Sequence, residues 1–524
     1  TVGVGKEGPR NLSKPIKHSH FAGLGPREYL MHGRDSRKGL FDRSVQTMDP
    51  GALTKSVVSA MQDVVIKEAD CKTTAGIELP KNNVDILGRY AAAPIKDKNG
   101  KIICKRNQII THAIRDAIYK DSSITTVKVR SPLHCKTVGG VCQKCYGTAP
   151  GTMKLQHLGT PVGTLSAQAM GEPVTQMTMN TFHGGGTSSS PSAGLPKVKQ
   201  LLSMNADKNN QAVLSTVSGK ITAIKRGGTG TYDSVYVNGT LHKIPHILGG
   251  GPQMLRVAVG DYVTKGDFLT VGNLSDIRSG RVGITSADPN TLLKLKTDSI
   301  GQDDALRQTR DYLAGSLSKA FDDAAGAGKI SNRHLETIMG KLTSKATVTN
   351  GGSSNLVRGS VASSAGIQRW NEQNAGISNA KRYSISKAQE IVGKIAAQPY
   401  KSKTGTIIVN KGEQITANHI AHLVAAGFKV IRAYAAPIQY TPELVGVQQA
   451  GSFGSENWLS NLGTRELNNQ IARGAMYGQK DKLTDSRARM MTGKMLPIGE
   501  GFSKPKRFIN ALGTNIRNFF LRKK

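Results

Sequence analysis

Four cysteines constrain this chain more than any other feature, because a shared metal ion would bring separate segments to one point. Cys142 and Cys145 form a CxxC turn, Cys135 lies one loop earlier, and Cys71 comes from well upstream. Four thiolates in this arrangement suit a tetrahedral structural Zn²⁺ ion. A redox CxxC is the alternative, but it would need a thioredoxin-like βαβ context that the sequence lacks. We therefore predict that these four cysteines are the metal ligands.

Two other residues of metal-binding type lie near this set. His134 directly precedes Cys135, and Cys104 is the fifth cysteine of the chain. Four thiolates already complete a tetrahedral site. We expect His134 to lie beside a ligand without being one, and Cys104 to be a buried thiol.

The charge balance limits the class of partner. Lys and Arg number 71 against 36 Asp and Glu, which leaves a net charge of +35. Such a chain suits a polyanion, and phosphate neutralisation would make its affinity strongly dependent on salt. A ribosomal or packaging protein is the less specific interpretation. Aromatic residues make up only 5%, too few to stack many bases, so contacts to the nucleic-acid backbone are favoured.

Length and hydrophobicity argue against one compact globule. The chain has 524 residues, enough for several domains, and its 38% of hydrophobic residues is modest for that size. No apolar run approaches the length of a membrane helix, and the start shows no signal-peptide pattern. We expect a soluble, cytoplasmic chain.

The stretch from Gly171 to Gly186 predicts a helix followed by a mobile loop. Pro173 suits the first turn of a helix, where its missing N–H costs little. Four side chains recur at i, i+3, i+4 and i+7 and share one helical face: Gln176, Met179, Asn180 and His183. The loop that follows is rich in Gly, Ser and Thr. A helix with a polar face followed by such a loop is typical of a lid that closes on a ligand. An ordinary amphipathic helix with a solvated histidine is the alternative.

A second helical pattern runs from about Gly23 to Val65, with basic and apolar residues on different faces. Two such faces suit a long helix laid along nucleic acid, and a plain surface helix is the alternative. Asp49 and Pro50 interrupt the pattern, because a proline inside a helix costs about 3 kcal/mol. We predict a kink at Pro50, with Asp49 as the N-cap of a second helix.

An internal repeat relates residues 88–132 to residues 393–437 without a gap, at an offset of 305. Gly88, Ile103 and Ile110 of the first copy, for example, match residues of the same type in the second. The pattern predicts a strand at 101–104, a helix from about Thr111 and a strand at 125–129. Coincidence between two basic, glycine-rich segments is the alternative to a duplicated α/β module.

Several motifs together resemble the largest subunit of multisubunit RNA polymerases, of the bacterial β′ type. The elements Gly-Glu-Pro, Thr-Gln, Thr-Met, Thr-Phe-His and Gly-Gly follow in order within 171–186, as in the trigger loop of that family. Arg37-Lys38-Gly39-Leu40 and Leu53-Thr54-Lys55 look like the bridge helix. Gly-Val-Cys-x-x-Cys-Tyr-Gly is similar to the family's second zinc site, and Gly-Leu-Pro-Lys-Val at 194–198 to the end of the trigger hairpin.

This resemblance implies roles for particular residues in nucleotide addition. His183 would approach the leaving pyrophosphate as a positional catalyst or proton donor, Met179 would pack on the incoming base, and Gln176 would face the sugar. Thr181 belongs to the same element. Asn180 stands where bacterial relatives usually have arginine, so we expect weaker phosphate stabilisation. The resemblance also implies bridge-helix residues that contact nucleic acid: Arg37, Lys38, Thr47, Gly51, Ala52 and Lys55.

The family's magnesium motif, Asn-Ala-Asp-Phe-Asp-Gly-Asp, is not among these 524 residues. Nucleotide addition requires catalytic Mg²⁺, so its ligands are expected on another polypeptide. The resemblance therefore implies the C-terminal half of a split subunit, as in giant-phage polymerases. Its expected partners are a β′ N-terminal fragment, a β-type subunit, template DNA, RNA and NTPs. The expected location is the cytoplasm of an infected bacterial host, or the virion.

Two other classes stay open. One is a non-catalytic, zinc-stabilised scaffold that binds nucleic acid, and the other is a virion structural protein. For the polymerase interpretation, the expected fold class is α+β, an extended multi-module subunit with a long bridge helix, a trigger-loop helical hairpin, a zinc site of four cysteines and small β-barrel-like modules. The expected divisions are 1–22 (basic arm), 23–70 (bridge helix), 71–150 (α/β module with zinc site), 151–205 (trigger-loop helices), 206–288 (β-rich module), 289–361 (helical jaw-like region), 362–440 (linker and second α/β copy) and 441–524 (clamp-base region and basic tail).

Overall fold

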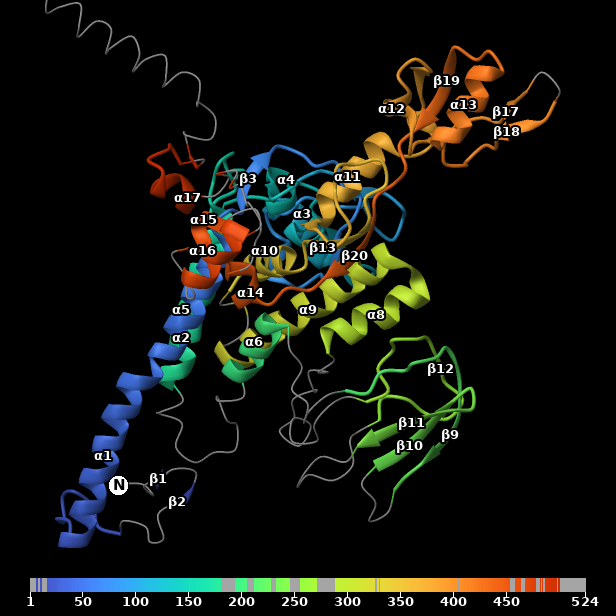
Figure 1. The fold of residues 1–524 in the computed structure, drawn as a ribbon. Helices are drawn as coiled ribbons and strands as arrows, with labels where there is room; N and C mark the ends of the chain where they lie inside the picture. The colour runs from blue at the N-terminus through green and yellow to red at the C-terminus, as the bar shows by residue number, and fades with distance from the viewer. Residues whose placement is uncertain are drawn as a thin grey trace, which may run out of the picture.

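The structure is a computed structural model with helices and strands mixed along the chain, as an α+β class requires (Figure 1). Its central body is helical, and smaller strand-containing units lie around it. It describes residues 6–7, 10–11, 17–149, 151–180, 194–204, 212–227, 232–245, 255–270, 288–325, 328, 330–402, 405–452, 458–462, 467–476, 481, 483, 486–496 and 498–499.

The largest hydrophobic core joins helices that are far apart in the sequence. Buried side chains such as Met61, Met170, Leu202, Leu317 and Ile338 meet in it. The helices that contribute are α2 (Met48–Met61), α5 (Val162–Asn180), α6 (Gly194–Ser203), α9 (Gln302–Ala325), α10 (Asn332–Leu342) and α14 (Val447–Ser452). This core fixes α5 between α2 and α10.

Two glycines allow α5 to approach α2 closely. A Cβ atom on Gly163 would lie 2.1 Å from the carbonyl oxygen of Met61, and one on Gly171 would lie 2.4 Å from Cγ2 of Thr54. Real Cβ atoms do not approach other atoms so closely, so only glycine fits at either position. The two helices are therefore held at a short, defined distance.

The long N-terminal helical stretch is broken at Thr47, but the predicted kink at Pro50 and the expected cap at Asp49 are both wrong, because Pro50 lies inside α2. Helix α1 (Pro26–Gln46) and α2 are separated at Thr47, which is the N-cap of α2 with backbone angles in the right-handed helical region. Asp49 is instead the second residue of α2, and Pro50 the third. Because Thr47 keeps helical angles, the two helices run on in nearly the same direction in Figure 1.

Pro173 does not occupy the first turn of a helix, contrary to the prediction. Helix α5 begins at Val162, so Pro173 lies in its interior. A proline there cannot donate to the carbonyl oxygen four residues earlier. The next turn is supported locally, because the hydroxyl of Thr175 donates to the carbonyl oxygen of Gly171 at 3.1 Å. Tertiary packing of α5 against α2 and α10 outweighs the local cost.

Two small modules share most of their elements in the same order. The first contains β4 (Ile77–Pro80), η1 (Val84–Ile86), β5 (Ile95–Lys96), β6 (Ile102–Cys104), α3 (His112–Lys120) and β7 (Thr126–Val129). The second contains β15 (Lys381–Ser384), α12 (Ala388–Ile391), β16 (Ile395–Ala396), β17 (Tyr400–Lys401), β18 (Ile407–Val409), α13 (Ala417–Ala425) and β19 (Val430–Tyr434), after η4 (Ile377–Asn379). The bounds of β5, β6 and α3 recur in β17, β18 and α13 at an offset of 305. Strand β16 of the second module corresponds to the isolated β-bridges of Tyr90 and Ala91 in the first.

Backbone hydrogen bonds recur in the two modules as well. Gly88 N–H donates to the carbonyl oxygen of Ile110 at 2.9 Å, and Gly393 N–H donates to that of Ile415 at the same distance. Both glycines have positive φ, 73° and 85°. In each module the first strand pairs antiparallel with the last, β4 with β7 and β15 with β19. The two segments therefore share a fold as well as a sequence pattern.

The remaining described elements form smaller units. One antiparallel sheet has the strand order β11-β10-β9-β12 and a core that includes Ile221, Val235 and Ile244. The strands of this sheet are β9 (Gly219–Lys225), β10 (Tyr232–Val237), β11 (Thr240–Pro245) and β12 (Tyr262–Val263). These strands lie within residues 206–288, and the β-rich, barrel-like module expected there stays a prediction.

A second antiparallel sheet, of order β14-β13-β20, lies beside α11 (Ser364–Asn374). Its strands are β13 (Lys345–Asn350), β14 (Val361–Ser363) and β20 (Gln439–Glu443). The other elements are β1 (Lys6–Glu7), β2 (Arg10–Asn11), α8 (Pro289–Ile300), α15 (Trp458–Asn461), α16 (Leu467–Met476) and α17 (Ser486–Met491). Among the helices in the described ranges, none has the length and apolar character needed to cross a membrane.

Candidate metal centre and paired helices

The four predicted cysteines meet in the structure. Strand β3 (Val65–Glu68) pairs in parallel with β8 (Gly140–Cys142), which brings the segment after β3 next to the CxxC turn. Helix α4 (Gln143–Tyr146) continues that turn, and η2 (Pro132–His134) leads into Cys135. The four Sγ atoms lie within 4.8 Å of one another, and those of Cys71 and Cys145 are 3.6 Å apart.

These distances fit a tetrahedral metal. A Zn–S bond of about 2.3 Å in a regular tetrahedron places sulfur atoms roughly 3.8 Å apart. Cys142 and Cys145 are buried, and Cys71 and Cys135 are half-buried, so water has little access to the centre. The cluster can therefore hold a structural metal ion, and the positive charge of that ion would offset the negative charge of the thiolates.

Contacts among the four thiols shift the pKa values of the cysteines in opposite directions. The hydrogen bond with Cys135 is the main cause that lowers the pKa of Cys71 well below its usual range and that of Cys142 to about 7. Burial raises the pKa of Cys135, while hydrogen bonds from the other cysteines, Cys135 first, raise that of Cys145. Two of the thiols thus favour the ionised form required of a metal ligand.

Arg130 is the functional residue that the cysteine pattern did not reveal. Its buried guanidinium donates through Nη2 to the sulfur atoms of Cys71, Cys142 and Cys145, at 3.4, 3.5 and 3.3 Å. Burial is the largest single influence and disfavours the charge, but the interactions with Cys145, Asp70 and Cys142 together outweigh it and raise the pKa of Arg130. A cation in this position offsets the excess negative charge of four thiolates around a divalent ion.

A second layer of contacts orients Arg130. Its Nη1 atom pairs with Oδ1 of Asp70 at 2.8 Å, and the other carboxylate oxygen of Asp70 pairs with Lys144 at 2.8 Å. Nη1 also donates to Oδ1 of Asn107 at 3.0 Å. The signal available in the sequence was the position of Asp70, directly before a ligand. Such outer partners commonly fix the orientation of groups around a metal.

The two residues excluded as ligands point elsewhere. Nε2 of His134 lies 2.8 Å from Oδ1 of Asp311, so the ring is directed at α9. Cys104 is fully buried in the core of the first module, and burial raises its pKa to about 11. Both predictions are confirmed in their geometry.

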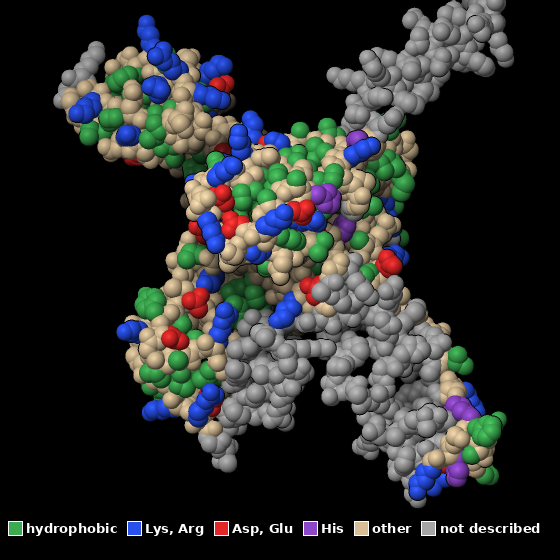
Figure 2. All heavy atoms as spheres, turned by 180° about the vertical axis from the view of Figure 1, so that it is seen from behind, with side chains coloured by type: hydrophobic (Ala, Val, Ile, Leu, Met, Phe, Trp, Pro, Cys, Tyr) green, Lys and Arg blue, Asp and Glu red, His purple; other side chains and the backbone are tan. Residues whose placement is uncertain are grey.

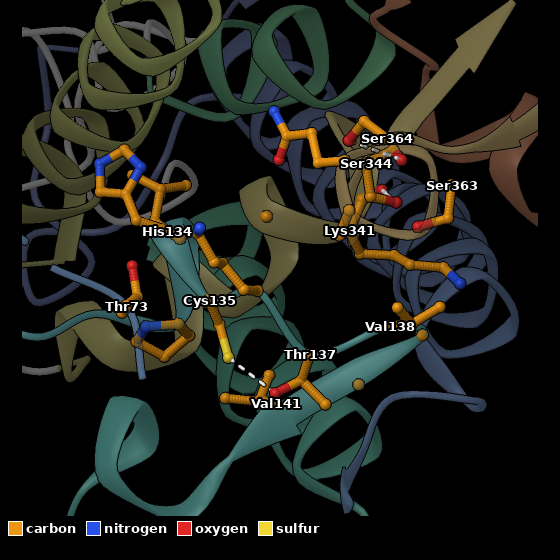
Figure 3. A pocket seen from close by; sticks show the side chains of 18 of the residues that line it. Thr73, His134, Cys135, Thr137, Val138, Val141, Lys341, Ser344, Ser363 and Ser364 are labelled. Atoms are coloured by element: carbon orange, nitrogen blue, oxygen red, sulfur yellow. Dashed lines mark hydrogen bonds between the residues drawn. The ribbon is translucent and has the colours of Figure 1, made fainter. Parts of the chain in front are cut away.

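A polar cavity of about 470 Å³ adjoins the cysteine cluster. Figure 3 shows Cys135 beside Thr137, whose atoms Sγ and Oγ1 lie 3.2 Å apart, and Lys341 in another part of the lining. Lys341 forms an ion pair with Asp63. Of the predicted site residues whose side chains are described, Cys135 alone lines this cavity. The cavity therefore belongs to the surroundings of the metal centre rather than to the predicted reaction site.

Most of the predicted nucleic-acid residues whose side chains are described on α1 and α2 are exposed. The side chains of Arg37 and Lys55 are exposed, as are Gly51 and Ala52, and Thr47 is half-buried. The backbone of Lys38 belongs to α1, and its side chain lies outside the described part of the chain. The opposite side of α2 is buried, with Val57 and Met61 in the main core.

The predicted catalytic residues lie at the end of α5 and beyond it. Gln176, Met179 and Asn180 belong to the last turns of the helix, but their side chains are not described. Thr181 and His183 lie outside the described residues. The structure therefore places the base of this predicted lid and leaves the lid itself untested.

A cavity of about 560 Å³ lies beside the packed helices α2 and α5. Gly51 and Lys55 of α2, Glu172 and Thr175 of α5, and Arg487 of α17 line it. Asp49, near the start of α2, also forms an ion pair with Lys199 of α6, with 2.7 Å between Oδ2 and Nζ. The start of α2 is therefore connected to both helices that flank residues 181–193.

Comparison with known protein families agrees with this arrangement. The family model described as RNA polymerase Rpb1, domain 5, matches residues 23–385, more than half of the chain. The chain belongs to this family. The match includes α1, α2, α5, α6 and all four cysteines of the cluster.

Three relatives illustrate the extent of the similarity, each being a DNA-directed RNA polymerase subunit beta'. The protein of Ureaplasma urealyticum is 33% identical over 364 residues, which cover 67% of this chain and 26% of the relative. That of Caldicellulosiruptor saccharolyticus is 29% identical over 515 residues, 95% of this chain and 37% of the relative. That of Moorella thermoacetica is 29% identical over 507 residues, 94% and 36% respectively. The Rpb1-family chain thus spans roughly a third of these relatives and corresponds to a C-terminal part of a β′ subunit.

Proposed function

We propose that this chain is a subunit of a DNA-dependent RNA polymerase and supplies the bridge helix and the trigger loop for nucleotide addition and translocation. In this proposal α1 and α2 are the bridge helix, and α5 and α6 flank the trigger loop. The observation that carries the proposal is the close packing of α5 on α2, where Gly171 lies against Thr54. The Asp49–Lys199 ion pair adds a second link, from α2 to α6.

This packing supplies a mechanism by which the loop and the bridge helix respond to each other. A rigid base on α5 and α6 leaves residues 181–193 to close over the incoming NTP. His183 would then stand near the leaving pyrophosphate, Met179 near the base and Gln176 near the sugar. These side chains position the substrate and stabilise developing charge, because phosphoryl transfer depends mainly on such effects.

The catalytic Mg²⁺ ions would be held outside these 524 residues. The aspartate motif of the family is not in this sequence, and we propose that a separate β′ N-terminal polypeptide carries it. Those ions would neutralise charge on the α-phosphate and on the attacking 3′ oxygen. This chain's residues would bind and orient the NTP.

Exposed apolar side chains along α1 and at the start of α2 support the presence of partner chains. Tyr29, Leu30, Leu40 and Met48 are each more than 60% exposed. In Figure 1 helix α1 extends away from the helical body. An apolar helix surface left in water is costly, so we propose that a β-type subunit and the β′ N-terminal fragment cover it, with DNA and RNA on its basic side.

Zinc is the metal proposed for the cysteine cluster. Cys71, Cys135, Cys142 and Cys145 are all thiol ligands in tetrahedral distance range, which favours zinc over oxygen-preferring ions. The site would join the segment after α2 to the segment before α5. Its role would be structural, since no ligand position is left open.

The direct test is a primed RNA-extension assay on the complex purified with the tagged chain. The proposal predicts Mg²⁺-dependent extension, partners with the aspartate motif in mass spectra, and a loss of elongation rate of at least tenfold in His183→Ala. Asn180→Arg should speed addition by restoring a phosphate contact. Unchanged extension in His183→Ala would contradict the catalytic role.

A non-catalytic scaffold is the second candidate. Asn180 in place of the expected arginine and the interruption of the bridge helix at Thr47 favour it. A scaffold would retain DNA binding and zinc but lend nothing to the chemical step. A complex that binds DNA and shows no extension with any variant would support this candidate.

A further inference from the structure

The second small module is inserted into the surface of the chain with its two ends together. Ala435 N–H donates to the carbonyl oxygen of Asn374 at 3.1 Å, and Ala375 and Ala435 form a parallel β-bridge. The module has its own core, in which Ile391 and Leu423 are fully buried. In Figure 1 it projects from the helical body at the end of α11. It is therefore a compact unit on a short double connection.

The two copies differ in what holds them to the rest of the molecule. In the first copy, Arg89 forms a buried ion pair with Glu336 of α10, and Arg130 reaches the cysteine cluster. At an offset of 305, these positions are Lys394 and Ala435 in the second copy. Lys394 instead lies over the ring of Tyr383 in its own module, 5.0 Å from its centroid. The shared core is thus kept while both anchoring arginines are replaced.

The inserted module is more basic than the chain as a whole. Residues 375–436 contain nine Lys and Arg against the two acids Glu390 and Glu413, a net charge of +7 in 62 residues compared with +35 in 524. Lys387 pairs with Glu390 at 3.3 Å. Seven other basic side chains in the described part of the module form no ion pair: Lys381, Arg382, Lys394, Lys401, Lys411, Lys429 and Arg432.

Two of these cations are placed directly opposite each other. Arg382 of β15 is the register partner of Arg432 of β19, and both side chains are exposed. Like charges in directly opposed positions destabilise a sheet. Ser384 and Val430 extend the same outward face, and Figure 2 shows Lys and Arg side chains spread over the module. An arginine pair maintained at a cost to the sheet indicates an anionic partner.

We propose that this outward face of β15 and β19 binds the phosphate backbone of double-stranded DNA, away from the reaction site. Two exposed guanidinium groups on neighbouring strands can each contact a phosphate, and the other unpaired cations raise the local potential. Tyr434 is the one aromatic side chain on this face of β15, β19 and β16, so the surface is not built to stack single-stranded bases. The choice of DNA among polyanions rests on the proposed polymerase function.

The first experiment measures binding of the full chain to a fluorescent duplex of about 30 base pairs at several salt concentrations. Arg382→Gln/Arg432→Gln should weaken binding several-fold and reduce the slope of log affinity against log salt by about 2, because each phosphate contact contributes about 1. The matched control is Lys96→Gln/Lys101→Gln, which removes two exposed charges from the first module. An equal loss in both variants, or no loss in the arginine variant, would overturn the proposal.

A second variant replaces residues 376–434 by a short Gly-Ser linker, which the adjacent ends permit. It should bind the duplex with a lower salt slope, keep its zinc content, and still support extension on a short primed scaffold. Unchanged duplex binding would overturn the proposal. If co-purifying subunits were lost at the same time, the face would be assigned to a protein partner instead. If neither the unmodified complex nor any variant extends RNA, the proposed polymerase function fails. The dependence of duplex affinity on salt still tests the DNA-binding surface in that case.

Discussion

Arg89 and Glu336, 247 residues apart in sequence, form a buried two-pronged ion pair. Nη1 and Nη2 of Arg89 donate to the two carboxylate oxygens of Glu336, each at 2.7 Å. Ser131 also donates its hydroxyl to Glu336, at 2.5 Å. The pair ties the first small module to α10, and α10 packs on α5. It therefore connects the cysteine-bearing region to the helix that leads into the proposed trigger loop.

Removing one member of this pair should be costly. Arg89→Met leaves a carboxylate buried without its cation, which typically costs about 3–5 kcal/mol. We expect a matching fall in the free energy of unfolding, measured by urea denaturation. The double variant Arg89→Met/Glu336→Leu should recover most of the loss because no charge is left unpaired. A double variant as unstable as the single one would show that the cost is not electrostatic.

The cysteine cluster predicts zinc content and a stability linked to it. Cys142→Ser should reduce bound zinc from one ion per chain to near zero and lower the melting temperature, because a closed structural site contributes folding free energy. Elemental analysis and thermal unfolding measure the two effects. Cys104→Ser is the matched control: its thiol lies in the core of the first module, so zinc content should stay at one. Full zinc content in Cys142→Ser would refute the ligand assignment.

The contact between Gly171 and Thr54 leaves no room for a side chain at position 171, where α5 crosses α2. Gly171→Ala places a Cβ atom within 2.4 Å of Thr54 and should destabilise the chain by about 1–3 kcal/mol through overpacking. Adding Thr54→Ala removes the two atoms met first and should restore part of the loss. Gly51→Ala on the same helix as Thr54 is the control. A Cβ atom there meets nothing within 4 Å, so a gain of up to about 1 kcal/mol is expected.

His334 predicts a loss of stability on acidification. Burial lowers its pKa below the ordinary value of 6.5, and its Nδ1 atom lies 3.1 Å from Oγ of Ser166 on α5. The unfolded chain therefore binds this proton more readily than the folded chain, so stability is full above pH 6.5 and falls as the pH drops below it.

His334→Gln should reduce the difference in melting temperature between about pH 7.5 and about pH 5.5, which lie on either side of that ordinary value. His242, whose pKa is also lowered by burial but which lies in the β9–β12 sheet, provides the comparison. If His334→Gln and the unmodified chain lose the same amount on acidification, the histidine does not contribute to the effect.

Local patterns in the sequence identified much of the cysteine site and the duplicated module. The CxxC turn and the spacing of Cys71 and Cys135 were sufficient to predict which thiols meet, because metal ligation restricts both residue type and geometry. The predicted helix and strands of the first module agree with α3, β6 and β7 within one residue. Its apolar positions recur in the second copy, since both must fill the same kind of core.

The partners of charged groups could not be predicted in this way. Arg130 and Asp70 complete the cysteine site, but the place of Asp70 directly before Cys71 is a weak signal, and nothing in the sequence around Arg130 indicates that the two meet. Local rules predict Pro173 at a helix start, whereas packing of α5 between α2 and α10 keeps it in the helix interior. The same rules predict Asp49 as an N-cap, but its carboxylate instead pairs with Lys199 of α6, 150 residues away.

The sequence by itself determined which four cysteines cluster, the repeat, the basic character and the membership suggested by its motifs, because these depend on residue type and spacing. Only the tertiary structure decided that Gly171 contacts Thr54, that Arg89 is buried against Glu336 while Lys394 is not, and that Arg382 faces Arg432. Those relationships arise from packing and pairing between segments that are distant in the chain, where the free energy depends on contacts that no local pattern records.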